Sequence, residues 1–154
     1  MKKRPLTQLV PDVRNAMEEV LAEVTETAAM DLKEAGPFWT GHFESTWQVN
    51  PGKKAVPANI ANPLAVPKKP RTKEITPIYM PDSPNLGGYT LGNRAKYTLV
   101  AMDIVPLAEK KGVAVYRGDA PGATAPKFWF DTYVNARLPT MVNRTLQSVF
   151  RRFS

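Results

Sequence analysis

The side chains best suited to metal chemistry are too few to complete a site. His42 is the only histidine in the chain, and there is no cysteine. His42 and Glu44 lie two residues apart and look like half of a metal site, but zinc and related metals need three or four ligands. The sequence therefore predicts no metal ion and gives His42 a structural or exposed role.

Acid–base chemistry would need two carboxylates that converge on one point. Asp103 with Glu109, or Asp119 with Asp131, are the pairs to consider, but nothing in their spacing brings them together. The glycine-rich stretch 87–92 lacks the Gly-Lys-Ser/Thr ending of a phosphate-binding loop and is expected to be a turn. We predict no catalytic residue and no cofactor, and hence a protein that is not an enzyme.

Basic side chains are numerous but unevenly placed. The net charge is +7, yet residues 1–41 hold seven acids and five bases, whereas residues 42–154 hold sixteen bases and seven acids. This asymmetry suits either proximity to nucleic acid or contacts between subunits of opposite charge. Few aromatic residues are interleaved with the basic ones, so a solvated or subunit-facing role is favoured over direct contact with DNA.

These residues must be positioned by a single domain, 1–154, because two independent cores would each be marginal at this length. Apolar residues recur every three or four positions from 11 to 35, including Val13 and Met17, which predicts an amphipathic helix with Pro11 in its first turn. Alternating residues predict a strand over 43–50, and 74–80 is expected to pair with it as a hairpin.

Residues 51–73 contain five prolines and no amphipathic period. A structureless stretch of this length is rare inside a compact domain, so we predict an extended arm that is completed by contact with another chain. Two groups of basic residues, at 68–73 and at the C-terminus, are the candidates for contact with phosphates.

The rest of the chain predicts short elements and a final helix. Residues 95–105 fit a helix or a strand, and the helix is favoured. A helix over 127–153 should be kinked or divided at Pro139. The other expectations are turns over 81–92, a strand over 113–116 and a loop over 118–126. The predicted architecture is α+β, with N- and C-terminal helices packed on a small antiparallel sheet.

Three blocks together resemble a known family. Residues 40–47 are similar to a "TG-x-L-x-x-S" turn-to-strand signature, residues 93–103 to an "N-x-x-x-YA-x-x-x-E-x-G" block, and residues 126–129 to a "P-x-PF" entry to a last helix. In this order they resemble the tail-completion or neck proteins of long-tailed phages, the lambdoid minor-tail-protein family.

The resemblance implies a structural virion protein in the phage neck, assembled in the host cytoplasm. It implies a homo-oligomeric ring, commonly sixfold or twelvefold, that lies between a portal-proximal adaptor and the tail. The ring could lie near the DNA in the channel, and no contact with a membrane is expected. A basic DNA-binding accessory protein is the alternative. An enzyme of unrecognised type is a weaker one.

Candidate subunit-interface residues follow from the arm, from the resemblance and from the tryptophans, for which core packing is the default and an interface the alternative. They are Trp39, Gly41, Trp47, Pro57, Pro63, Pro67, Lys68, Lys69, Arg71, Phe128 and Trp129.

Overall fold

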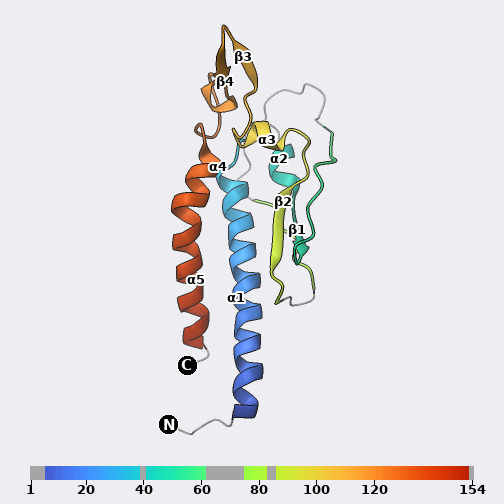
Figure 1. Cartoon of the computed structure of the whole chain (residues 1–154), viewed down its shortest axis with the longest axis vertical. Helices are drawn as coiled ribbons and strands as arrows, with labels where there is room; N and C mark the ends of the chain where they lie inside the picture. The colour runs from blue at the N-terminus through green and yellow to red at the C-terminus, as the bar shows by residue number, and fades with distance from the viewer. Residues whose placement is uncertain (1–5, 39–40, 62–74, 83–85, 153–154) are drawn as a thin grey trace.

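The computed structural model describes residues 6–38, 41–61, 75–82 and 86–152. The architecture is α+β, as predicted: a long N-terminal helix lies beside a C-terminal helix, and two small antiparallel sheets occupy the other side and one end (Figure 1).

Helix α1 spans Leu6–Ala35 and begins five residues earlier than predicted. Pro11 lies inside the helix, so its placement in the first turn was wrong. The proline cannot donate a backbone hydrogen bond to the carbonyl of Thr7, but both residues are exposed and lie near the helix end, where water can replace that bond. The C-terminal limit at Gly36 is as predicted.

Helix α2, His42–Ser45, replaces the first half of the predicted strand 43–50. Gly41 has a φ of 84°, a left-handed conformation that suits glycine, and the Ser45 N–H donates to the Gly41 carbonyl at 2.9 Å. The chain therefore closes one helical turn before strand β1 begins. Strand β1 spans Trp47–Pro51.

The partner of β1 is strand β2, Tyr89–Asn93, in antiparallel register with Trp47 opposite Asn93. The predicted strand over 74–80, and its hairpin with 43–50, are wrong, since the described residues 75–80 contain no strand. Pro77 lacks the N–H that a ladder needs. The segment is held through a side chain instead, because the buried Lys33 Nζ donates to the Thr76 carbonyl at 2.6 Å.

Short elements follow β2. Helix α3, Thr98–Ala101, confirms the favoured helix within 95–105. Strands β3, Ala108–Lys110, and β4, Val113–Val115, form an exposed hairpin. Only β4 was predicted. A single 3-10 turn, η1, spans Arg117–Asp119 and leads into an irregular loop.

The C-terminal helix is divided, as predicted, but the irregularity precedes Pro139. Helix α4 spans Trp129–Thr132, a π turn η2 spans Tyr133–Arg137, and helix α5 spans Leu138–Arg152. The Leu138 N–H donates to the Tyr133 carbonyl, five residues back. An α-helix here would require Pro139 to donate to residue 135, which it cannot do.

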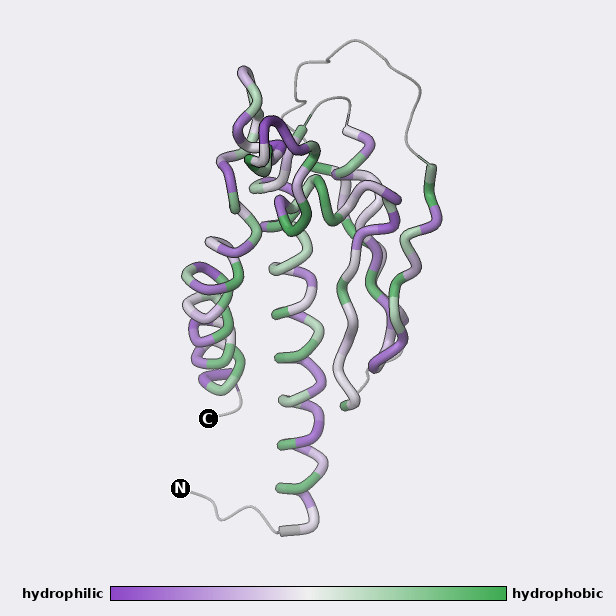
Figure 2. The backbone as a smooth tube through the Cα atoms, turned by 45° about the horizontal axis from the view of Figure 1, so that its top comes forward, coloured by the Kyte–Doolittle hydropathy of each residue, from purple (hydrophilic) through white to green (hydrophobic). Residues whose placement is uncertain are grey.

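The hydrophobic core lies where α1, the β1–β2 sheet and α4 meet. Phe43 is at its centre, with its ring 5.8 Å from that of Trp47 and 6.3 Å from that of Trp129, edge to face in both cases. Leu32 of α1 and Tyr133 complete this buried group. Figure 2 shows that hydrophobic residues also recur along α1 toward its N-terminal turns.

Asn93 joins three of these elements through its buried amide. Its Oδ1 accepts hydrogen bonds from Thr46 Oγ1 and the Ala95 N–H, both at 2.9 Å, and its Nδ2 donates to the Phe43 carbonyl at 2.7 Å. Thr98 Oγ1 lies 3.1 Å from the same Oδ1. One side chain thus connects β2 to the α2–β1 turn and to α3.

Replacing Asn93 with alanine should lower the free energy of unfolding by about 2–4 kcal/mol, because the buried groups that it now bonds lose their partner. Urea unfolding followed by circular dichroism measures the change. Asn143→Ala, at an exposed position of α5, is the matched control and should leave the midpoint nearly unchanged. Equal midpoints for the two variants would contradict this role for Asn93.

Candidate functional site

A buried ion pair organises the end of the molecule that carries the β3–β4 hairpin. Arg117 Nη2 donates to Asp103 Oδ2 at 2.8 Å, and the Asp103 side chain is fully buried. The same carboxylate accepts the backbone N–H groups of Gly118 and Phe128, each at 3.1 Å. Asp103 has a φ of 58°, a conformation that aspartate and asparagine tolerate better than most residues.

The Arg117 guanidinium has further acceptors besides this carboxylate. Its Nε and Nη1 donate to the carbonyls of Ala101 and Ala125, both at 3.1 Å, and Nη2 also reaches the Pro126 carbonyl at 3.2 Å. The planar fork therefore ties α3, the loop and the start of α4 together. We call Asp103 and Arg117 the loop-anchoring pair.

The loop-anchoring pair was not predicted from the sequence. Asp103 was a candidate only as a partner for Glu109, and the structure places Glu109 on the exposed strand β3. Asp103 and Arg117 are fourteen positions apart and separated by a whole hairpin, so no helical or strand period connects them. The one local signal is the 3-10 turn chemistry at Arg117–Asp119, where Asp119 Oδ2 accepts the Tyr116 N–H at 3.0 Å. That hydrogen bond, with Lys127, lowers the pKa of the Asp119 carboxyl.

Arg117→Met should lower the free energy of unfolding by about 3–5 kcal/mol, because it leaves the Asp103 carboxylate buried without its charged partner. Arg117→Lys should restore little of the loss, since an ammonium on a flexible stem does not reproduce the planar set of donors. Arg144→Met removes an exposed charge of α5 and should change stability little. Chemical denaturation of the three variants measures the difference, and a full rescue by lysine would contradict the account.

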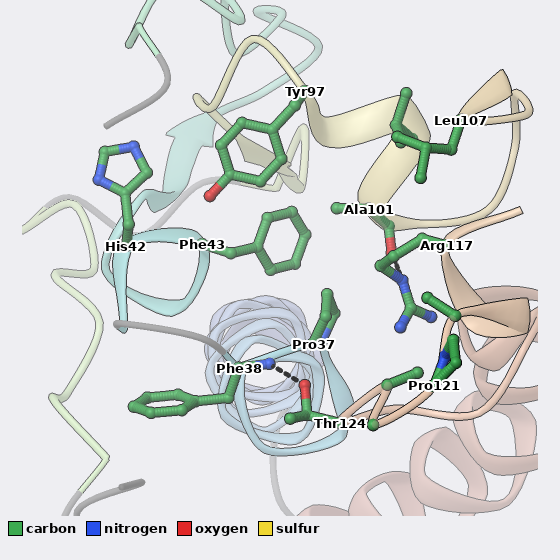
Figure 3. A pocket seen from close by; sticks show the side chains of 14 residues that line it. Pro37, Phe38, His42, Phe43, Tyr97, Ala101, Leu107, Arg117, Pro121 and Thr124 are labelled. Atoms are coloured by element: carbon green, nitrogen blue, oxygen red, sulfur yellow. Dashed lines mark hydrogen bonds between the residues drawn. The ribbon is translucent and has the colours of Figure 1, made fainter. Parts of the chain in front are cut away.

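A cavity of about 430 Å³ lies beside the loop-anchoring pair (Figure 3). Its walls are mainly apolar and come from the α1–α2 connection, α2, α3 and the loop before α4. They include Phe38, Phe43, Tyr97, Val100, Leu107 and Pro121. The Phe38 N–H donates to Thr124 Oγ1 at 2.7 Å and so holds two of these walls together.

The polar groups of this cavity do not form a reactive set. The His42 ring is stacked on that of Tyr97 at 6.0 Å, and burial raises the pKa of the Tyr97 hydroxyl. His42 Nε2 is buried and has no hydrogen-bond partner among the described residues. Arg117 also lines the cavity, but its donors are engaged as described above. The lining suits an apolar group with few polar atoms.

Comparisons with family models, curated proteins and solved structures found no match. Within the described part of the chain, no group of three or more metal-ligating side chains comes together. None of the helices in that part is long and apolar enough to cross a membrane.

Among the predicted interface residues, the two described tryptophans lie in the core. Trp47 is 6% exposed and Trp129 3%, and Trp129 Nε1 donates to the Ala101 carbonyl at 2.9 Å. For both residues the structure therefore favours core packing, the default. Gly41 forms the turn before α2. The residues Trp39, Pro63, Pro67, Lys68, Lys69 and Arg71 lie outside the described residues.

Phe128 and Pro57 are on the surface. The Phe128 ring lies 5.1 Å from that of Tyr116, and Lys127 Nζ lies over both rings. Phe128 has a φ of 54°, so its backbone is held by the Asp103 carboxylate in an unfavourable conformation for a bulky residue. Its exposed ring lies at the same end of the molecule as the loop-anchoring pair.

Two groups of exposed apolar residues were not predicted. The first, which we call the α1 stripe, consists of Leu9, Val10, Val13 and Met17. Sequence periodicity assigned Val13 and Met17 to the buried face, and the structure corrects this. At the C-terminal end of α5, Arg152 pairs with Glu19 and Glu23 of α1. The turns of α1 that precede Glu19 therefore extend beyond the end of α5 (Figure 1).

The second group, which we call the hairpin-end patch, consists of Leu99, Ile104, Val105, Leu107 and Val113. These residues belong to α3, to the β3–β4 hairpin and to the connection between them. Backbone hydrogen bonds from Ile104 and Leu107, to the carbonyls of Leu99 and Val115, fix that connection. The patch borders the cavity, which Leu107 also lines.

Proposed function

We propose that this chain is a structural subunit of the neck of a tailed phage, a ring-forming tail-completion or head–tail connector protein. The observation that carries the proposal is spatial. The three sequence blocks that carry the resemblance, at 40–47, 93–103 and 126–129, are far apart along the chain but meet in one network of contacts.

The first and second blocks meet through the Asn93 amide, which bonds Thr46 and the Phe43 carbonyl. The first and third meet through the edge-to-face rings of Phe43 and Trp129. The second and third meet at the Asp103 carboxylate, which accepts the Phe128 N–H at 3.1 Å. The convergence therefore supports treating the three short motifs as one resemblance.

The surface composition supports assembly with other copies. Helix α1 contains seven acids and two bases and α5 contains three arginines and no acid, but part of this contrast is satisfied within the protomer, where Arg152 pairs with Glu19 and Glu23. The α1 stripe and the hairpin-end patch add exposed apolar surface at two separate places, which marks contact sites on soluble proteins. We infer a homo-oligomeric ring, sixfold or twelvefold, that contacts a portal-proximal adaptor and the tail within the virion.

The proline-rich arm belongs to the same proposal. Its described part, 51–61, is attached to its own protomer: the Ile60 N–H donates to the Arg94 carbonyl at 2.8 Å and the Lys96 N–H to the Ile60 carbonyl at 2.9 Å. The remainder, 62–73, carries Pro63 and Pro67 and the basic residues near its end. We propose that this remainder contacts a neighbouring subunit or the adjoining ring.

Replacing residues 62–73 with a glycine–serine segment of equal length should leave the thermal unfolding of the isolated protein unchanged and should abolish joining of heads to tails. Electron microscopy of particles, with labelled antibody against this chain, measures both its position and the fraction of joined virions. The triple variant Lys68→Ser, Lys69→Ser, Arg71→Ser is the matched control that removes the charge and keeps the prolines.

Normal virions from the replaced chain would contradict the role of the arm. Absence of the chain from purified particles would overturn the neck proposal itself. Retention of DNA in a gel shift, with a steep dependence on salt, would favour the basic DNA-binding accessory protein instead.

A further inference from the structure

We propose that one face of α5 binds the phosphate backbone of duplex DNA without reading its sequence. We call this surface the α5 arginine face, and its exposed members are Thr140, Arg144, Gln147, Ser148 and Arg151. The inference goes beyond the proposed function and does not depend on it, because it concerns a surface of the single chain. In a neck ring it places α5 toward the DNA channel.

Helix geometry brings the two arginines of this face to one side of α5. Arg144 and Arg151 are seven positions apart, so they differ by about 20° around the axis and by about 10.5 Å along it. The fully buried Val149 lies on the other side of the helix. Figure 2 shows hydrophilic residues along the side of α5 that is turned away from α1. Both guanidinium groups are therefore open to solvent on the same side of the molecule.

The chain does not neutralise the arginines of this face. Arg152 pairs with Glu19 and Glu23 of α1, and it is left out of the face for this reason. Arg144 and Arg151 form no ion pair with any residue in the part of the chain that the structure describes. Their two positive charges are therefore available to a partner.

The surroundings of the face carry little opposing charge. Residues 132–152 contain four arginines and no acid. A groove of about 540 Å³ between α1 and α5 continues the face, and its lining includes Arg137, Arg144 and Asp31. Burial raises the pKa of the Asp31 carboxyl, and the nearby charge of Arg137 opposes this shift. Because Asp31 compensates Arg137 in this way, we count only Arg144 and Arg151 as phosphate contacts.

The composition of the face favours a phosphate backbone over a protein partner. No apolar residue belongs to the face, whereas the centres of protein interfaces are mainly apolar and aromatic. The exposed ring of Phe150 lies about 100° around the helix from Arg151. Arginine, serine, threonine and glutamine are common donors to phosphate oxygens, and such contacts carry no sequence information. The face therefore suits DNA of any sequence.

The lack of aromatic rings on the face also favours a duplex over a single strand. Proteins that bind single strands stack the bases on aromatic side chains, and phosphate contacts need no such ring. The rise of about 10.5 Å between the two arginines lies between the widths of the two grooves of a duplex, about 6 and 12 Å. Two long side chains at this separation can reach phosphates on either side of a groove.

Two phosphate contacts imply weak binding with a shallow dependence on salt. Each neutralised phosphate adds about 0.9 to the magnitude of the slope of log affinity against log salt concentration. The two arginines therefore contribute about 1.8, whereas an accessory protein with six to ten contacts would show a slope of about 5 to 9. Binding this weak is measured in solution, because a gel does not retain it.

The test is the fluorescence anisotropy of a labelled duplex of about 30 base pairs, titrated with the purified full-length chain between about 20 and 200 mM salt. The double variant Arg144→Gln, Arg151→Gln should reduce the magnitude of the slope by about 1.8. The double variant Lys53→Gln, Lys54→Gln is the matched control, since it removes the same charge at exposed positions outside α5 and should leave the slope unchanged. Gln147→Lys adds a cation between the arginines and should increase the slope by about 0.9.

Circular dichroism checks that each variant is folded. Equal slopes for the α5 double variant and its control would overturn the inference, as would a wild type that does not bind the duplex at the lowest salt concentration. Tighter binding of a single strand of the same length would overturn it as well. So would competition by polyglutamate as strong as that by unlabelled duplex, because it would assign the face to an acidic protein.

The position of the chain in particles is measured separately with the labelled antibody. A neck position combined with no effect of the α5 double variant rejects this inference alone. A reduced slope for that variant, combined with absence of the chain from particles, supports the inference and rejects the neck proposal.

Discussion

The Arg117 guanidinium holds together segments that come from different parts of the chain. Asp103, Ala101, Ala125 and Pro126 come from a helix end, a turn and a loop, and each places an oxygen around the same planar group. The charge of a buried carboxylate is tolerated only because this cation and two backbone N–H groups surround it. The β3–β4 hairpin, which has little apolar burial of its own, lies between Asp103 and Arg117 in the chain and is anchored at its base by these bonds.

The interaction also determines what surrounds it. By fixing the loop before α4, it sets one wall of the apolar cavity and presents Leu107 at its edge. By accepting the Phe128 N–H, Asp103 starts α4 at the place where Trp129 enters the core against Phe43. The core and the candidate contact surface therefore both depend on this interaction, and a substitution of Arg117 should disturb both.

The long elements of the fold could be predicted from the sequence, and most of the short ones could not. The body of α1 and a division of the last helix follow from periodicity and from Pro139, whereas periodicity at Thr98–Ala101 fitted both a helix and a strand. The β1–β2 pairing does not, because Tyr89–Asn93 lies in a segment rich in turn residues and the register depends on the Asn93 amide. Periodicity could not predict the loop-anchoring pair, because a hairpin separates its two residues. It also could not predict the exposure of Val13 and Met17, because that exposure depends on where α5 ends.

The π turn at Tyr133–Arg137 has a geometric consequence for everything that follows it. Each extra residue in a helix turns the following side chains by about 100° around the axis. Tyr133, which points into the core, and Val149, which is fully buried, therefore share a side only because of the wider turn between them. The added residue therefore corrects the rotation of the helix, so that α5 still faces α1 although Pro139 cannot donate the hydrogen bond of a regular α-helix.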